Sequence, residues 1–144
     1  NRSGVLSITA TALSDIPRPP VQRVVLARNP TDSHDVFLYH KTSRRMVYDQ
    51  ARTEQPGYDD VILWNERGEI TESCSANIVI DLDDELINPP IESGLLGGTF
   101  RSELLEQERI MERVITIEMW HAARRMWLIN SVRKWMDVVL IDNA

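Results

Sequence analysis

The stretch Glu69-Ile-Thr-Glu-Ser-Cys-Ser-Ala-Asn-Ile78 decides how the fold of this chain of 144 residues is interpreted. It places one carboxylate, Glu72, among small or uncharged neighbours at a predicted strand end or bulge. If Glu72 is buried there, it needs a positively charged partner to offset its lost hydration, and a protonated ring nitrogen is such a partner. A solvent-exposed glutamate in a turn is the plainer interpretation of this stretch taken alone.

Composition and charge favour a single domain that binds a small molecule. The chain is 42% hydrophobic, which at this length supports one ordinary core rather than two. Its 16 basic and 22 acidic side chains give a net charge of -6 without a basic block, so nucleic acid and anionic membrane are poor candidates for the main partner. Cys74 is the single cysteine, and no apolar run is long enough for a bilayer span or a signal peptide, which favours a cytoplasmic protein.

The first twenty residues differ in character from the rest of the chain. Residues 5–13 alternate like a half-buried strand, and they lead into the proline-rich stretch 14–20, where regular structure is broken. We therefore interpret residues 1–20 as a strand and an interdomain linker. Because the chain begins with Asn1 rather than Met, we expect it to be a piece of a longer protein.

The remaining residues alternate between strand and helix patterns. Apolar and β-branched runs predict strands at residues 21–27, 36–39, 60–64, 69–71, 76–81, 85–88, 112–117, 126–130 and 138–141. The strands between residues 60 and 88 are expected to form an antiparallel meander. Helices are predicted at residues 42–55, after Gly97-Gly98, and at 118–125.

Lys41 lies between a predicted strand and a predicted helix that Thr42 or Ser43 would cap. The end of a strand that enters a core can desolvate an amine in part, so that the amine loses its proton near neutral pH and can act as a nucleophile. A solvated surface lysine is the plainer alternative.

Two polar turns are candidates for binding a phosphate group. Gly97-Gly98-Thr99 precedes an amphipathic helix, whose free N–H groups and dipole favour an anion, although an ordinary loop is equally consistent with the pattern. Residues 130–133 follow a hydrophobic strand and would bring a second set of donors, or form a simple polar strand end. The three histidines have no metal-ligand spacing, so no metal site is predicted. An amine, a buried carboxylate and a phosphate turn are together what pyridoxal phosphate requires of a protein.

The order of these motifs resembles the large C-terminal domain of class IV (fold-type IV) pyridoxal-phosphate enzymes. The family includes branched-chain and D-amino acid aminotransferases and 4-amino-4-deoxychorismate lyase. The resemblance implies an α+β fold over residues 21–144, with mostly antiparallel strands in a barrel-like sheet and flanking helices, as in D-amino acid aminotransferase. It also implies a small N-terminal domain that this chain lacks, supplied in the same or another chain, and a homodimer.

Within the family, Phe37-Leu-Tyr-His-Lys-Thr-Ser-Arg-Arg45 and Trp127-Leu-Ile-Asn-Ser-Val-Arg-Lys-Trp135 most resemble the lyase module fused behind aminodeoxychorismate synthase component I. That likeness implies a lyase of folate biosynthesis that forms 4-aminobenzoate and pyruvate. A class IV aminotransferase acting on branched-chain or D-amino acids is the first alternative. An orphaned, non-catalytic domain that serves assembly is the second.

The resemblance also implies a role for individual residues. They are the Schiff-base lysine Lys41, Glu72 as the partner of the pyridine nitrogen, Ser75 beside the ring, Arg45 near the ring oxygen, Gly98, Thr99 and Ser131 as phosphate donors, and Arg133 as a contact for a substrate carboxylate. Two departures from the family pattern stand out. Phe100 occupies the place of a second threonine, and the absent small domain would normally add an arginine to the phosphate site.

Overall fold

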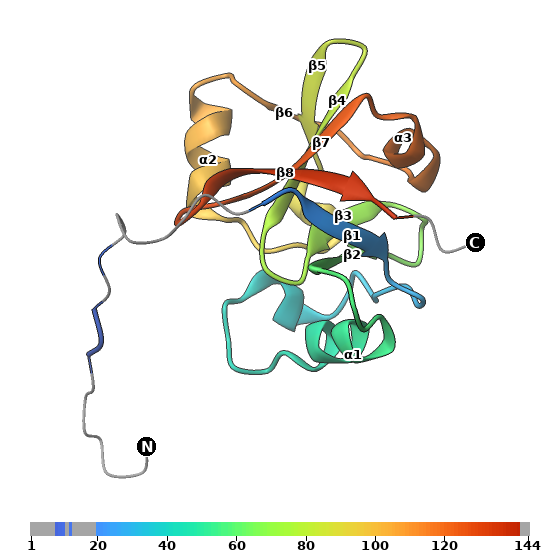
Figure 1. Cartoon of the computed structure of the whole chain (residues 1–144), viewed down its shortest axis with the longest axis vertical. Coiled ribbons are helices and arrows are strands. Elements are labelled where there is room, and N and C mark those ends of the chain that lie inside the picture. The colour runs from blue at the N-terminus through green and yellow to red at the C-terminus, as the bar shows by residue number, and fades with distance from the viewer. Residues whose placement is uncertain (1–7, 11, 13–19, 142–144) are drawn as a thin grey trace.

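A computed structural model of the chain describes residues 8–10, 12 and 20–141 (Figure 1). The strand predicted at residues 5–13 and the linker predicted at 14–20 therefore lie largely outside the described residues. Within the described part of the chain, no helix is long and apolar enough to cross a membrane.

One eight-stranded sheet, in the order β3-β2-β1-β8-β7-β4-β5-β6, forms the framework. Its strands are β1 (Gln22–Leu26), β2 (Asp60–Trp64), β3 (Ile70–Ser73), β4 (Asn77–Leu82), β5 (Glu85–Asn88), β6 (Met111–Glu112), β7 (Arg125–Asn130) and β8 (Lys134–Leu140). Four strand pairs are antiparallel and three are parallel. The curled α+β architecture predicted from the family resemblance is confirmed.

Strand β1 joins the two halves of the sheet. It pairs in parallel with β2 on one side and with β8 on the other. The simple meander predicted for residues 60–88 is wrong at one place, because β3 and β4 are not hydrogen-bonded neighbours. Strand β4 is almost fully buried and pairs with β5 and β7, which satisfy its backbone groups on both edges.

The helical segments are η2 (Val36–Tyr39), α1 (Met46–Glu54), η3 (Ile91–Ser93), α2 (Thr99–Glu106) and α3 (Ile117–Ala122). The strand predicted at residues 36–39 is therefore wrong, because the Asp35 carboxylate accepts a hydrogen bond from the Phe37 N–H and caps a single 3₁₀ turn. Helix α1 begins later than predicted, since Thr42 Oγ1 instead accepts from the Arg44 N–H in the preceding loop. The strand predicted at 112–117 is wrong for most of its length, because β6 ends at Glu112 and α3 begins at Ile117.

Alternating strand residues divide the core between the two faces of the sheet. On one face, Val24, Ile78 and Leu128 pack in a cluster that includes the fully buried Trp120 of α3. On the opposite face, α1 covers β1 and β2 through a second cluster, whereas α2 covers β4 and β7 through a third. The segment between β3 and β4 lies between the areas covered by α1 and α2, and this is where the candidate site is found.

Candidate functional site

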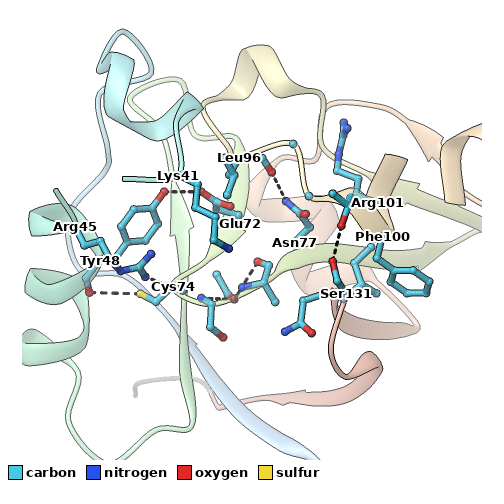
Figure 2. A pocket seen from close by; sticks show the side chains of 18 of the residues that line it. Lys41, Arg45, Tyr48, Glu72, Cys74, Asn77, Leu96, Phe100, Arg101 and Ser131 are labelled. Carbon is cyan, nitrogen blue, oxygen red and sulfur yellow. Dashed lines mark hydrogen bonds between the residues drawn. The ribbon is translucent and has the colours of Figure 1, made fainter. Parts of the chain in front are cut away.

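A pocket of about 610 Å³ lies between the loop before α1 and the start of α2 (Figure 2). The predicted site residues that line it are Lys41, Arg45, Glu72, Ser75, Gly98, Thr99 and Ser131. The structure thus brings together residues from four separate motifs. Arg133, the predicted contact for a substrate carboxylate, is not among the residues that line this pocket.

Glu72 is the buried carboxylate of the pocket. Ile62 pairs with Ser73 and Trp64 pairs with Ile70, so three residues of β2 oppose four residues of β3, and the extra residue makes the bulge predicted near Glu72. Glu72 is only 5% exposed, and its Oε1 accepts a hydrogen bond of 2.7 Å from the Tyr48 hydroxyl. Burial raises the pKa of Glu72 to about 7, against the opposing effect of this hydrogen bond and of the Leu96 N–H.

Glu72 has no ion pair among the described residues, although the Arg45 guanidinium favours its charged form from a distance. An ionised carboxylate buried without a paired cation is costly, and it recruits a positive group or takes up a proton. This arrangement suits a ligand that brings its own N–H⁺ to the floor of the pocket.

Lys41 lies in the loop between η2 and α1, and Figure 2 shows its side chain extending into the pocket. The expected position directly after a strand is wrong, since a 3₁₀ turn precedes it. The residue is exposed in the described chain, so the desolvation expected of a reactive lysine is not provided by the described residues alone.

Arg45 is held against the pocket wall by two contacts. Its guanidinium carbon lies 4.6 Å from the centre of the Tyr48 ring, and its Nη2 donates a hydrogen bond of 2.7 Å to the Cys74 carbonyl. Cys74 is a buried, free thiol whose pKa is raised to about 12 by burial, as expected of a packing residue rather than a nucleophile.

Asp60 organises the turn that carries Ser75, and sequence reasoning missed it. Its carboxylate accepts hydrogen bonds from the hydroxyls of Ser73 and Ser75, at 2.8 and 2.5 Å, and pairs with Arg52 at 2.9 Å. Asp60 begins a strand and is 2% exposed. A single buried aspartate before an apolar run gives no sequence signal of its own, because its partners are distant in sequence.

The start of α2 forms the opposite wall. Gly98 precedes the helix, and no side chain caps the free N–H groups there. A Cβ at Gly98 would collide with Oδ1 of Asn77, whose Nδ2 donates a hydrogen bond of 2.8 Å to the Leu96 carbonyl. Thr99 Oγ1 lies 2.5 Å from Ser131 Oγ, so the two predicted phosphate turns meet at this point.

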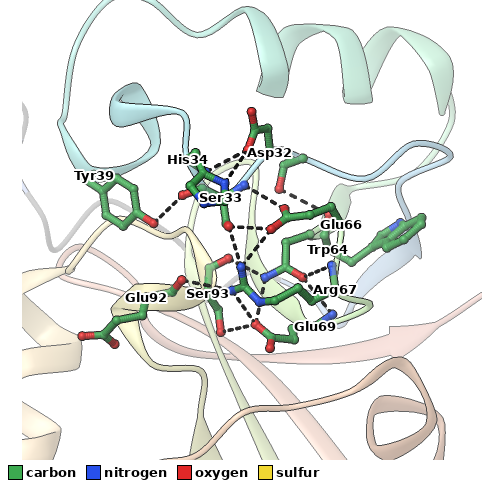
Figure 3. A network of polar contacts seen from close by, with 12 residues as sticks. Asp32, Ser33, His34, Tyr39, Trp64, Glu66, Arg67, Glu69, Glu92 and Ser93 are labelled. Carbon is green, nitrogen blue, oxygen red and sulfur yellow. Dashed lines mark hydrogen bonds and ion pairs between the residues drawn. The ribbon is translucent and has the colours of Figure 1, made fainter.

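A polar cluster connects the loop before η2 with the 3₁₀ turn η3 (Figure 3), and sequence reasoning missed it as well. We call Ser33, Asn65, Arg67, Glu69 and Ser93 the loop cluster. Arg67 donates to Ser33 Oγ at 2.6 Å and to Glu69 Oε2 at 2.8 Å, while Ser93 Oγ donates to the same Glu69 oxygen at 2.9 Å. Ser33 lies shortly before the segment with Lys41, and Ser93 lies before Gly97-Gly98.

Among residues 8–10, 12 and 20–141, no group of three or more histidine, cysteine, aspartate or glutamate side chains is placed to hold a metal ion.

The family of this chain follows from its match to a protein-family model. A family model described as "Amino-transferase class IV" matches residues 1–141. The chain belongs to the class IV aminotransferase family. Among relatives, a protein of Schizosaccharomyces pombe named "Putative aminodeoxychorismate lyase" is 24% identical over 98% of this chain and 64% of its own length.

Solved structures agree on the fold. A crystal structure named as a "Putative amino-acid aminotransferase" from Mesorhizobium loti is 36% identical, with a TM-score of 0.81 over 88% of this chain and 62% of that one. A structure named as a "Putative 4-amino-4-deoxychorismate lyase" from Legionella pneumophila is 22% identical, with a TM-score of 0.78 over 86% of this chain and 49% of that one. The chain therefore spans less than two thirds of the length of these relatives.

Class IV aminotransferases typically use pyridoxal phosphate, and the residues of the pocket fit this cofactor. A buried carboxylate without an ion pair among the described residues suits the pyridine N–H⁺. The uncapped start of α2, kept open by Gly98, suits the phosphate.

Proposed function

We propose that this chain is the large domain of a pyridoxal-phosphate-dependent 4-amino-4-deoxychorismate lyase. The observation that carries the proposal is the meeting of Lys41, Glu72 and the start of α2 around one pocket. The chain contains only two lysines, Lys41 and Lys134, and Lys134 is not among the residues that line the pocket. Lys41 is therefore the residue of this chain that we propose to bind the cofactor covalently.

The other residues would hold the cofactor in place. Glu72 would accept a hydrogen bond from the pyridine N–H⁺ and keep that nitrogen protonated. The Thr99 and Ser131 hydroxyls and the N–H groups that follow Gly98 would bind the phosphate. When bound, pyridoxal phosphate supplies the electron sink that the reaction needs.

The lyase reaction removes a proton and breaks a C–O bond. Lys41 would take the proton from the ring carbon that bears the amino group. The electron pair of that C–H bond forms the last ring double bond as the C–O bond to the enolpyruvyl group breaks, which yields 4-aminobenzoate. Lys41 would return a proton to the methylene carbon of the leaving enolate, which becomes pyruvate, so no water is consumed.

A cationic wall of the pocket supports a substrate with more than one carboxylate. Besides Lys41, the basic residues that line the pocket are His40, Arg44, Arg45, Arg52 and Arg101. The Arg44 guanidinium lies 4.1 Å over the Phe37 ring and has no ion pair among the described residues. We therefore propose Arg44, rather than Arg133, as the contact for a substrate carboxylate.

An aminotransferase is the second candidate. It is favoured by the Mesorhizobium loti structure, whose name describes an amino-acid aminotransferase and whose identity to this chain, 36%, exceeds that of the lyase-named relatives above. The same lysine and carboxylate would then serve transfer of the amino group to a 2-oxo acid.

The rest of the binding site is proposed to come from outside this chain. Lys41, Thr99 and Ser131 are all exposed, so a further wall is needed to exclude water from the reacting atoms. We propose that a small N-terminal domain, in the same or another polypeptide, supplies that wall within a cytoplasmic homodimer. A purely structural, non-catalytic role would leave the residues of the pocket without a purpose.

Product analysis distinguishes the two reactions. The full-length protein is incubated with pyridoxal phosphate and 4-amino-4-deoxychorismate, and pyruvate is measured with and without an added 2-oxo acid. Release of pyruvate without the 2-oxo acid is expected of the lyase. Amino transfer that depends on the 2-oxo acid, without pyruvate release, would replace the lyase by the aminotransferase.

Chemical trapping tests the cofactor site itself. Borohydride reduction in the presence of pyridoxal phosphate, followed by peptide mass mapping, is expected to label Lys41. Lys134, which lies 3.9 Å from Glu103 on the surface, is the internal control. Equal labelling of the two lysines, or none of Lys41, would contradict the catalytic interpretation.

A further inference from the structure

We propose that Tyr48 is a positioning residue that holds the Glu72 carboxylate in the orientation and ionised state in which it binds a pyridine N–H⁺. The inference rests on the cofactor site proposed above and does not depend on which reaction that site performs. Tyr48 belongs to helix α1 and to neither of the two predicted phosphate turns.

The geometry around Tyr48 is closely determined. Tyr48 lies in the first turn of α1 and is 8% exposed, and its hydroxyl is 2.7 Å from Glu72 Oε1. The Arg45 guanidinium covers one part of the ring at 4.6 Å, and the Cys74 thiol lies 3.5 Å from the Tyr48 carbonyl. Packing on several sides restricts the ring, so the direction of the hydroxyl bond to Glu72 is restricted as well.

The hydrogen bond from the Tyr48 hydroxyl affects the ionisation of Glu72. Burial raises the pKa of Glu72 to about 7, and the nearby Asp60 acts in the same direction. The Tyr48 hydroxyl, the Leu96 N–H and the Arg45 guanidinium oppose the increase. Burial and the neighbouring Glu72 also raise the pKa of Tyr48, so its hydroxyl stays protonated and acts as a donor.

Loss of the donor has a definite consequence for the ligand. Without the Tyr48 hydroxyl, a larger fraction of the Glu72 side chains is protonated at neutral pH. A protonated carboxyl is a weaker acceptor for a pyridine N–H⁺ than a carboxylate. The carboxylate also loses its fixed direction. A hydrogen bond to a charged group corresponds to about a tenfold change in affinity.

The experiment compares Tyr48→Phe with Tyr39→Phe in the full-length protein. Both changes remove one hydroxyl and keep the ring, but Tyr39 donates to the Ser33 carbonyl at 2.7 Å and does not line the pocket. The measurements are the affinity for pyridoxal phosphate between pH 6 and 9, and the titration of the Glu72 carboxyl carbon by NMR without cofactor. Thermal unfolding shows whether each variant is folded.

Tyr48→Phe is expected to raise the pKa of Glu72 and to weaken cofactor binding about tenfold near pH 7, with a smaller deficit at pH 9. Tyr39→Phe should change neither quantity. On a Glu72→Gln background, Tyr48→Phe should cause little further loss, since its partner is already gone. If Tyr48→Phe does not fold, ring-fluorinated tyrosine at position 48 is used, and the stronger donor should lower the pKa of Glu72.

Three outcomes separate this inference from the proposed function. An unchanged Glu72 titration together with unchanged cofactor affinity in Tyr48→Phe overturns the role of Tyr48 alone. Equal losses with and without Glu72 also overturn it, because Tyr48 would then act through packing. Failure of the unmodified protein to bind pyridoxal phosphate overturns the cofactor site and this inference together, whereas failure to release pyruvate affects only the choice of reaction.

Discussion

At the scale of single residues, Glu72 shows what it costs a fold to bury a carboxylate. Its carboxylate is buried beneath the pocket, and the Tyr48 hydroxyl and the Leu96 N–H compensate only part of the lost hydration. The pKa of about 7 means that the buried carboxylate is only partly ionised at neutral pH. A ligand with a positive N–H stabilises the ionised form and so binds favourably. The same burial makes the stability of the free protein depend on pH.

The pKa of Glu72 predicts the direction of that dependence. The value rises from 4.5 to about 7 on folding, so between these pH values the folded chain holds more protons than the unfolded chain. The contribution of Glu72 to stability is therefore fully present below pH 4.5 and lost as the pH rises through about 7. With 1.36 kcal/mol per pKa unit, the loss is on the order of 3 kcal/mol.

Glu72→Gln isolates this contribution from other titrating groups. Without cofactor, the variant is expected to be less sensitive to pH between 4.5 and 7, and more stable than the unmodified chain at pH 8, while it binds pyridoxal phosphate less well. Urea unfolding across this pH range measures the difference. Glu106→Gln, at an exposed position of α2, is the control, and equal pH profiles for the two variants would contradict the prediction.

At the scale of elements, the junction of the glycine turn with α2 is where sequence reasoning succeeded. A glycine pair followed by an amphipathic run is a local pattern, and a helix does follow it, although α2 already includes Thr99, which was expected to precede the helix. The reason for glycine at position 98, however, is not local. It is the side chain of Asn77, which approaches from β4 so closely that a Cβ would displace it.

Gly98→Ala is expected to push Asn77 away and break its hydrogen bond to the Leu96 carbonyl. The loss of that bond costs about 1 to 2 kcal/mol in stability, and displacement of the start of α2 should weaken phosphate binding. Gly97→Ala is the matched control, because its Cβ would meet only the flexible end of Ile91 at 3.3 Å. Thermal unfolding and titration with pyridoxal phosphate measure both effects, and equal behaviour of the two variants would exclude the Asn77 contact as the cause.

The elements that sequence reasoning missed have non-local causes. Residues 36–39 have the composition of a strand, but Asp35 caps a 3₁₀ turn, and Leu38 packs in the cluster beneath α1. The antiparallel neighbours predicted for β3 and β4 fail because β4 pairs with β7, a strand far along the chain. The lysine, the carboxylate and the two predicted phosphate turns, which line one pocket, each lie in a short sequence motif, whereas Asp60 and Tyr48 do not.

At the scale of the whole molecule, two walls of the pocket, the loop before α1 and the start of α2, lie outside the strands of the sheet. The loop cluster joins the segment before Lys41 to the segment before Gly98, and Figure 3 shows its members converging from different parts of the chain. Its one acidic member, Glu69, is strongly stabilised in the charged form. The hydrogen bond from Arg67 lowers the pKa of Glu69 to about 2, so the cluster should persist well below neutral pH.

Asn65 is the buried centre of this cluster and the residue that tests it. Its Nδ2 donates to Glu69 Oε2 at 2.9 Å and to the Ser93 carbonyl at 2.8 Å, while its Oδ1 accepts from the backbone N–H groups of Arg67 and Glu69. Asn65→Ala leaves these partners unsatisfied in a site with 0% exposure, which should cost about 3 kcal/mol. The midpoint of thermal unfolding is expected to fall by roughly 10 °C.

The loop cluster should also affect the ligand, since Asn65 and Ser93 set the course of the chain toward Gly98. Asn65→Ala is therefore expected to weaken the binding of pyridoxal phosphate at a temperature where the variant is still fully folded. Asn29→Ala is the control, because Asn29 is exposed and bonds to Glu54 at 3.0 Å away from the cluster. A variant Asn65→Ala that loses stability but binds the cofactor as tightly as Asn29→Ala would show that the cluster supports the fold without positioning the pocket.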